Sequence, residues 1–189
     1  NYDSEENFSE METTLREEML ALKAEGVTNL IFDLRSNSGG SGNHVKHILK
    51  LIAPSGEHVY AYDAVFDKKT QKYKIDSVTD DGSVTYQVGQ CETYQGENLW
   101  GHGKIIILVN ANTVSAGDHF TMAASAYPNV TVMGFTHSNG SCQGVNSVGF
   151  DYGMLTYSGA LLLNEDGSVS SSYHNLKKDK KISILGIKE

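Results

Sequence analysis

The chain has 189 residues, with 15 lysines and arginines against 23 aspartates and glutamates, which gives a formal net charge of -8. This acidic balance disfavours nucleic-acid binding, which needs a clustered positive face. No apolar run approaches the roughly 18 residues of a membrane-spanning helix. A chain of this length can bury the core of one domain, so we expect a single domain over 1–189 without a membrane span.

The first part of the chain predicts a helix, a strand and a second helix. Ser9 begins a capping-box pattern ahead of an apolar stripe at helical spacing, and Gly26 suits the end of that helix. The apolar run 30–34 is typical of a buried strand. After the glycine-rich turn 35–42, a second helix is expected over 43–52. Helices that alternate with a buried strand indicate an α/β layer structure.

The middle of the chain has a different character, with short segments in which polar and apolar residues alternate. Asp81 and Gly82 form a hairpin turn signal. The alternation indicates a sheet with one solvated face. We interpret residues 57–100 as an inserted β-hairpin region between two α/β units. The predicted strands are 58–62, 73–78 and 83–88.

The rest of the chain predicts a second α/β unit followed by more strands. The polar, glycine-rich stretch 136–145 is interpreted as a loop, and Asp166 and Gly167 form a further turn signal. The predicted elements are strand 104–110, helix 115–126, and strands 130–134, 154–157 and 159–163.

Ser115 stands where a buried strand is expected to turn into a helix. A hydroxyl there lies near the positive helix end, so Ser115 is a candidate nucleophile and the Ala116 amide a candidate oxyanion donor. The alternative is that Ser115, Thr113 or Asn112 caps the helix. The Gly39-Gly40 turn can also expose amides to an anion, or it can be an ordinary tight turn.

Three stretches of the chain carry these candidates in a fixed order. Residues 30–40 read LIFDLRSNSGG, residues 105–120 read IIILVNANTVSAGDHF, and residues 129–144 read NVTVMGFTHSNGSCQG. Together they resemble the C-terminal-processing, or tail-specific, serine peptidases. The resemblance implies a crotonase/protease-like α/β core, a spiral of strand-strand-helix units. It also implies Ser115 as the nucleophile, with an oxyanion hole from the Ala116 backbone and the Gly39-Gly40 turn.

The chain departs from this family at the general base. Tail-specific members carry a catalytic lysine in the loop after the serine, but residues 136–143 contain none. The chain therefore looks closer to the tricorn-like branch, which uses a histidine upstream of this core. We expect the base in an upstream segment or domain that this chain lacks. Within the chain His137 is the candidate base, and His119 and His174 are weaker ones. We expect surface or turn positions for His44, His47, His58 and His102.

The remaining candidates have supporting or structural roles. Asp33 and Arg35 are expected to hold the Gly-Gly turn in shape by charge-assisted hydrogen bonds. Asp118 takes the position of the family's acidic residue after the serine. The histidines and cysteines lack ligand spacing, so we expect no metal and no cofactor. Cys91 and Cys142 are compatible with one disulfide or with two buried thiols.

The sequence thus predicts the core of a serine endopeptidase that binds an extended polypeptide substrate by strand addition. By resemblance we expect an extracytoplasmic or secreted protein of the bacterial cell envelope, although the chain has no signal peptide. The oligomeric state stays open. Two alternatives come from other classes: an inactive peptidase-like fold that serves as a polypeptide-binding module, and a crotonase-type acyl-CoA enzyme without a serine nucleophile.

Overall fold

The computed structural model describes residues 4–67, 72–75, 92–101, 103–140 and 144–163. These residues fall into two compact units. The first comprises the described residues up to His58 and those of 94–140, and the second comprises those of 59–93 and 144–163. The β-rich second unit is therefore drawn from two stretches of the chain, whereas the sequence interpretation placed the β insertion at 57–100 alone.

The first unit is built on a parallel sheet with the strand order β1-β5-β6. Ile107 of the central strand is fully buried and is paired in register with Phe32. The Phe32 ring lies edge-on to Phe120 of the helix α3, with ring centroids 5.5 Å apart. That face of the sheet therefore packs on α3. The bounds are β1 (Asn29–Asp33), β5 (Lys104–Leu108), β6 (Val130–Met133) and α3 (Ala116–Ser125).

The opposite face of this sheet differs from the prediction. Ile31 points away from α3 and is 62% exposed, and the residues of β1 alternate between exposed and half-buried. An apolar run alone indicates a strand buried on both faces, but among the described residues only the face towards α3 has a helix packed on it. The strands were correctly predicted, and the burial of β1 was not.

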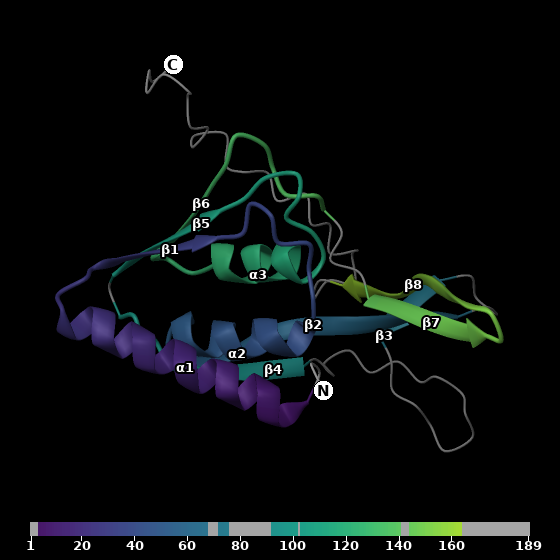
Figure 1. Cartoon of the computed structure of the whole chain (residues 1–189), viewed down its shortest axis with the longest axis horizontal. Coiled ribbons are helices and arrows are strands. Elements are labelled where there is room, and N and C mark those ends of the chain that lie inside the picture. The colour runs from purple at the N-terminus through teal and green to yellow at the C-terminus, as the bar shows by residue number, and fades with distance from the viewer. Residues whose placement is uncertain (1–3, 68–71, 76–91, 102, 141–143, 164–189) are drawn as a thin grey trace. The chain divides into compact units, whose positions relative to one another are not determined.

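Two further helices, α1 (Glu5–Ala24) and α2 (Gly42–Ile52), complete the first unit. The helix α3 lies between the sheet and α2, and α1 packs against α2 (Figure 1). Leu49 and Ile52 of α2 and Met19 of α1 are completely or almost completely buried between these layers. Within the described part of the chain, none of the helices is long and apolar enough to cross a bilayer.

The helix α1 begins earlier than predicted. Ser4 is its N-cap, and the Ser4 hydroxyl accepts a hydrogen bond from the Asn7 amide at 3.3 Å. The capping box predicted at Ser9 is wrong, because Ser9 lies inside the helix and its carbonyl accepts from the Thr13 hydroxyl. The predicted end is confirmed, since Gly26 follows the helix with a left-handed φ of 83°.

The other sheet has the strand order β3-β2-β8-β7, and β4 also pairs with β2. The printed pairings of β2 with β3, β2 with β8 and β7 with β8 are antiparallel. The bounds are β2 (Gly56–Asp67), β3 (Lys72–Ile75), β4 (Glu92–Gly96), β7 (Gly144–Phe150) and β8 (Gly153–Leu163).

Several predictions for this sheet need correction. The loop predicted over 136–145 ends where β7 begins, and the strands predicted at 154–157 and 159–163 are one continuous strand. The polar strand β4 was not predicted at all. In each case pairing with another strand decides the conformation: β7 pairs with the adjacent β8, and β4 and β8 pair with the distant β2. Strand 83–88 and the turns at Asp81-Gly82 and Asp166-Gly167 lie outside the described residues.

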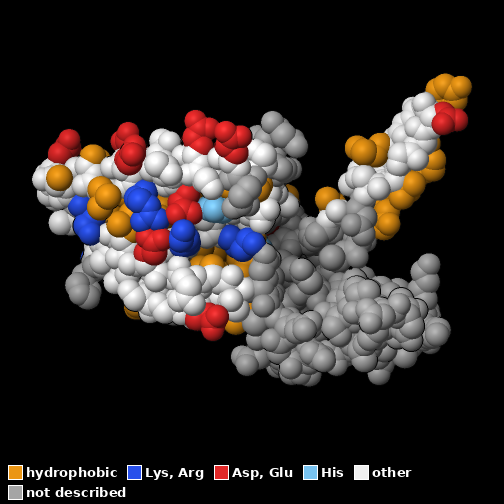
Figure 2. Space-filling view, turned by 90° about the horizontal axis from the view of Figure 1, so that it is seen from below, with side chains coloured by type: hydrophobic (Ala, Val, Ile, Leu, Met, Phe, Trp, Pro, Cys, Tyr) orange, Lys and Arg blue, Asp and Glu red, His pale blue; other side chains and the backbone are white. Residues whose placement is uncertain are grey.

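A cluster of charged side chains joins the elements of the first unit. Acidic and basic side chains lie beside each other on the face seen in Figure 2. The Glu12 carboxylate of α1 accepts from Arg16 and from Lys50, each at 2.8 Å, and contacts His47 Nδ1 at 2.5 Å. Arg16 also pairs with Glu97, which follows β4. The cluster therefore ties α1 to α2 and to the end of β4.

The Glu12 cluster makes stability depend on pH. Burial raises the pKa of Glu12, but hydrogen bonds from Lys50, His47 and Arg16 outweigh it and lower the pKa from 4.5 to about 2. A carboxyl group whose pKa is lower in the folded protein than in the unfolded chain stabilises the fold at pH values above its unfolded-state pKa. This stabilisation is lost as the pH falls through the folded-state pKa. We expect the free energy of unfolding to fall between about pH 5 and pH 2, by up to about 3 kcal/mol from this group.

Urea unfolding at stepped pH checks this expectation. In Glu12→Gln the fall with acidification should be smaller than in the unsubstituted chain, because no carboxyl remains to be protonated at this position. Glu10→Gln, at an exposed position of the same helix, is the matched control and should leave the fall unchanged. Parallel pH profiles for Glu12→Gln and the unsubstituted chain would contradict the assignment.

Candidate active site

Two loops that follow neighbouring parallel strands meet at one edge of the first sheet. The strands β1 and β5 run in parallel register to their last residues. The Leu34 amide donates to the Leu108 carbonyl at 2.9 Å, and the Thr113 hydroxyl donates to the Leu34 carbonyl at 2.7 Å. The Val114 amide donates to the Asn37 carbonyl at 3.0 Å. These bonds hold the turn after β1 against the turn before α3.

Ser115 begins α3 with an unusual backbone conformation. Its φ of 55° and ψ of -116° are strained for a residue with a side chain. The Ser115 hydroxyl makes no capping hydrogen bond, whereas the Ser115 carbonyl accepts from the His119 amide at 2.9 Å. Ser115 therefore occupies the N-cap position of α3, but its hydroxyl does not make the hydrogen bond to the helix amides that the capping explanation requires.

Gly39 lies directly against Ser115. A Cβ atom added at Gly39 would lie 2.7 Å from the Ser115 Cβ, 3.2 Å from the Ser115 Oγ and 3.1 Å from the Val114 carbonyl oxygen. Gly39 also has a φ of 101°, which residues with a side chain rarely adopt. Both the close approach and the dihedral therefore require glycine, and the approach brings the Gly-Gly turn next to the serine hydroxyl.

The backbone amides at this contact are not equivalent. The Gly39 amide donates to the Asn37 side-chain oxygen at 2.9 Å, so it is already engaged in shaping the turn. Among the described residues we find no hydrogen-bond acceptor for the amides of Gly40 and Ala116. Of the three predicted oxyanion donors, the Gly39 amide is thus already engaged, whereas the Gly40 and Ala116 amides have no acceptor among the described residues.

Two helices begin at this contact. The N-cap of α2 is Ser41 and that of α3 is Ser115. Gly40 and Ser41 line a pocket together with Ala116, so the N-terminal ends of both helices face the same space. Because a helix N-terminus carries partial positive charge, the electrostatics of this space favour a developing anion.

The loop after β6 is held against the start of α3. The Asn139 amide donates to the Thr113 carbonyl at 2.9 Å, and the Gly140 amide donates to the Asp118 carboxylate at 3.1 Å. Asp118 is only 1% exposed. The Ala111 amide donates to the Thr136 hydroxyl at 3.1 Å. Asp118 thus fixes the loop in which the family's lysine would lie.

His137 lies in this loop with an exposed side chain. Its Nδ1 is 2.7 Å from the Ser138 carbonyl oxygen. Since a carbonyl only accepts, this contact assigns the proton to Nδ1 and leaves Nε2 as the basic nitrogen in the neutral ring. His119, the next candidate, is 6% exposed within α3, and His174 lies outside the described residues.

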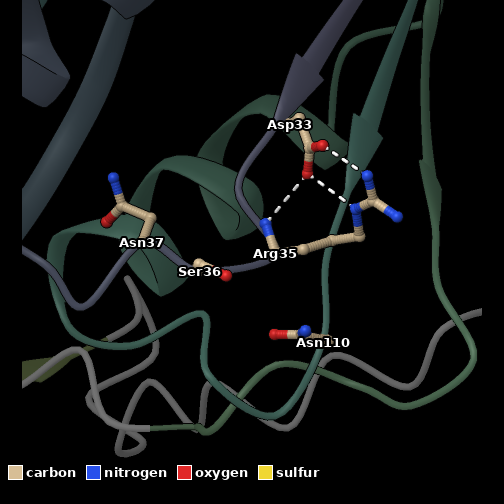
Figure 3. A pocket seen from close by; sticks show the side chains of 5 residues that line it. All are labelled: Asp33, Arg35, Ser36, Asn37 and Asn110. Carbon is tan, nitrogen blue, oxygen red and sulfur yellow. Dashed lines mark hydrogen bonds and ion pairs between the residues drawn. The ribbon is translucent and has the colours of Figure 1, made fainter.

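Asp33 and Arg35 form an ion pair at the start of the glycine turn. Arg35 Nε and Nη2 donate to the two carboxylate oxygens at 2.8 and 2.6 Å, and the Arg35 amide adds a third bond (Figure 3). The Arg35 side chain, followed by its amide, lowers the pKa of Asp33 to about 2. Both residues line a polar pocket of about 610 Å³ with Ser36, Asn37 and Asn110. The predicted charge-assisted bonds are present.

On the other side of Asn37 lies a smaller and mostly apolar pocket. It has a volume of about 130 Å³, and its described lining includes Phe32, Phe120 and His44 as well as Gly40 and Ala116. The expectation of a surface or turn position for His44 is wrong, since this half-buried side chain lines the pocket from α2. A lone histidine in sequence gave no signal for this position.

Within the described residues, no group of three or more metal-ligating side chains is found. Cys91 and Cys142 lie outside the described residues, so their pairing stays a prediction.

Comparison with known proteins identifies the family of this chain. Residues 5–182 match the family model of Peptidase family S41. The chain belongs to peptidase family S41. A search of curated proteins finds no match.

Solved structures similar to this S41 chain share its fold. A protein of Parabacteroides merdae ATCC 43184 with a provisional peptidase assignment has a TM-score of 0.61 at 21% identity, covering 85% of this chain and 47% of its own. The photosystem II D1 C-terminal processing protease has a TM-score of 0.59 at 16% sequence identity. The match covers 87% of this chain and 37% of the protease. Mature CPAF complexed with lactacystin has a TM-score of 0.55 at 15% sequence identity. The match covers 84% of this chain and 40% of CPAF. The chain thus spans less than half the length of each.

In this S41 chain the fold brings together the segments that the sequence singled out. Gly39 contacts Ser115, Gly40 and Ala116 line one pocket, and Asp118 holds the loop of His137. The α/β fold class is confirmed, and the likeness to S41 structures agrees with the expected protease-like spiral.

Proposed function

We propose that this S41 chain is the catalytic core of a serine endopeptidase with Ser115 as its nucleophile. The observation that carries the proposal is the strained backbone of Ser115, whose hydroxyl caps no helix and lies against the Gly39 turn. Strain of this kind persists only where the surrounding structure enforces it, and it concentrates at functional sites. The amides of Gly40 and Ala116 support the proposal as candidate oxyanion donors.

In the proposed reaction the Ser115 Oγ bonds to the carbonyl carbon of a peptide, and its proton passes to a general base. The carbonyl π electrons move to oxygen, and the amides of Gly40 and Ala116 donate to this oxyanion. When the C=O bond re-forms, the C–N bond breaks and the base returns its proton to the leaving amine. Water then attacks the acyl-enzyme by the same route and releases the acid.

The base is proposed to be a histidine. His137 is the candidate within the chain, because its Nδ1 contact with the Ser138 carbonyl favours the tautomer with a basic Nε2. The other candidate is a histidine upstream of Asn1, as in the tricorn-like branch. The absence of lysine from residues 136–143 favours both over a Ser-Lys dyad.

A second candidate function is that of an inactive polypeptide-binding module. The observation that favours it is the loop after β6, which lacks the family's lysine and carries only an exposed histidine. A peptidase fold without an assembled base could still hold an extended chain along its polar pocket.

A fluorophosphonate probe separates the two functions. The probe is added to the chain with its natural flanking sequence, and mass spectrometry locates the modified residue. We expect labelling of Ser115 in the folded protein and none after heat denaturation, because only an activated serine displaces fluoride. Ser125, an exposed serine at the end of α3, serves as the internal control and should stay unmodified.

The same reaction tests the base. If His137 is the base, His137→Gln slows labelling of Ser115 strongly, whereas an unchanged rate assigns the base to the upstream segment. No labelling of Ser115 in a protein that unfolds cooperatively would overturn the peptidase proposal and support the binding module.

A further inference from the structure

The strands β7 and β8 form a hairpin that extends beyond the pairing of β8 with β2. The two strands of the hairpin pair over residues 144–160, whereas β8 pairs with β2 at 161–163. Among the described residues, 144–160 thus form a two-stranded ribbon, and Figure 2 shows hydrophobic side chains along its length. A two-stranded ribbon alone is marginally stable in water, and a further strand or a packed layer is needed to stabilise it.

One face of this hairpin is apolar. The register pairs Val148 with Leu155, and residues two positions away along each strand lie on the same face. The apolar side chains of this face, which we call the hairpin face, are 44% to 63% exposed: Val148, Phe150, Leu155 and Tyr157. Together they leave apolar surface of the order of 400 Å² in contact with water, a size at which a patch on a soluble protein marks an interaction site.

The other face of the hairpin is more polar. There the hydroxyls of Ser147 and Thr156 form a hydrogen bond at 3.0 Å. Met154 also belongs to this face, where it pairs with Gly149, and it is 71% exposed. One apolar and one more polar face are typical of a sheet that is covered on one side. The hairpin face is therefore the one to which a covering layer would bind.

The charges of the hairpin disfavour a lipid bilayer as that layer. Residues 144–163 contain no lysine or arginine, and Asp151 is their only charged residue. Insertion of the turn would carry the Asp151 carboxylate toward the hydrocarbon, which is costly, and the net charge of -8 repels anionic lipids. A protein layer on the hairpin face leaves Asp151 in water at the turn.

The hairpin face is complementary to a copy of itself. Its aliphatic side chains lie in the middle, Phe150 lies next to the turn, and Tyr157 lies toward the other end. In a second copy related by a twofold axis through the middle, the strands run in the opposite direction, so the partner's Tyr157 lies over Phe150. The residue paired with Phe150 is Gly153, where an added Cβ would meet no atom within 4 Å. This open space accommodates an offset or edge-on pair of rings.

We propose that the hairpin face binds the hairpin face of a second copy of this chain in a twofold-symmetric dimer. Two such faces remove about 800 Å² of apolar surface from water, and the fully exposed Tyr152 at each turn adds to this area. Specific interfaces begin near about 1,000 Å² in total, and those at the low end belong to weak complexes. The dimer therefore dissociates in the micromolar range. The inference goes beyond the proposed peptidase function and does not depend on it.

Sedimentation velocity of the chain with its natural flanking sequence, from nanomolar to near-millimolar concentration, measures this association. We expect a monomer–dimer equilibrium. Leu155→Lys places a charge in the middle of the interface and should raise the dissociation constant at least about 100-fold. Met154→Lys is the matched control, because it adds the same charge at the neighbouring residue on the other face. It should change the dissociation constant by less than about threefold.

Hydrogen exchange of the unsubstituted chain shows whether the hairpin itself forms the contact. Amides of residues 144–158 should exchange more slowly above the dissociation constant and faster on dilution, whereas the exchange of α3 should not depend on concentration. Because this measurement needs no substitution, it decides the matter even if Leu155→Lys unfolds the hairpin.

The inference is overturned if the chain stays monomeric over the whole concentration range. Protection of the hairpin amides that does not change on dilution would then assign the hairpin face to a contact within the chain. Equal effects of Leu155→Lys and Met154→Lys, with exchange of the hairpin independent of concentration, would place the dimer contact elsewhere. A monomer that sediments with phosphatidylcholine vesicles, and loses this binding in Leu155→Lys, would assign the hairpin face to a lipid surface.

Discussion

Replacing Ser115 by glycine is expected to abolish peptide cleavage and to make the protein more stable than the corresponding alanine variant. Both substitutions remove the hydroxyl, so kcat/KM should fall at least about a thousandfold in each. Only glycine relieves the strain of a φ of 55°. Since such strain costs of the order of 1–3 kcal/mol, Ser115→Gly should unfold at a higher urea concentration than Ser115→Ala.

Ser4 provides the matched control for this experiment. The Ser4 hydroxyl caps α1, so Ser4→Ala should lose about 1 kcal/mol of stability with activity unchanged. Ser115→Ala should lose little stability, because the structure gives its hydroxyl no cap bond. If Ser115→Ala loses as much stability as Ser4→Ala and still cleaves peptides, Ser115 is a cap and another group is the nucleophile.

Substitution of Gly39 by alanine is the second change with a large expected effect. The new Cβ would lie 2.7 Å from the Ser115 Cβ, so the serine or the turn must move. A displacement of about 1 Å at a reacting group can cost a factor of about 100 in rate. We therefore expect Gly39→Ala to lower kcat/KM at least about 100-fold. The rate of fluorophosphonate labelling and the urea midpoint measure the two consequences separately.

Gly26 separates the steric clash from the backbone strain. Gly26 has a φ of 83°, close in character to that of Gly39, but a Cβ added there meets no atom within 4 Å. Gly26→Ala should therefore lose about 1 kcal/mol of stability and keep full activity. Activity retained in Gly39→Ala would mean that the Gly39 turn does not shape the site.

The contact between the Gly-Gly turn and the Ser-Ala turn was expected from the resemblance to the tail-specific peptidases, and the structure gives its physical reason, because each turn follows a strand of one parallel sheet. Parallel strands bring their carboxyl ends to one edge, so the Gly-Gly turn and the Ser-Ala turn converge there. The hydrogen bond from the Gly39 amide to the Asn37 side chain could not be predicted, because it depends on the rotamer of Asn37. Likewise, no local pattern reveals that His44 meets Asn7 from another helix.

The errors at the element level have the same origin. Ser4 and Ser9 are both plausible N-cap residues for α1. A capping box at Ser9 would need the Glu12 carboxylate to accept from the Ser9 amide, but this carboxylate contacts Lys50 and His47 instead. The strand β7 is rich in glycine and polar residues, and it is ordered by pairing with β8. Side-chain patterns record the preferences of one segment, whereas these outcomes are set by contacts with other segments: α2 for Glu12 and the neighbouring strand β8 for β7.

The hydrogen bond from the Thr113 hydroxyl to the Leu34 carbonyl joins residues 79 positions apart, and its consequence concerns biosynthesis. A nascent chain that has been translated only as far as β4 carries the glycine turn but no serine opposite it. Closing so long a loop has an entropic cost that only the packed core repays. The proposed peptidase site is therefore absent from unfinished and unfolded chains.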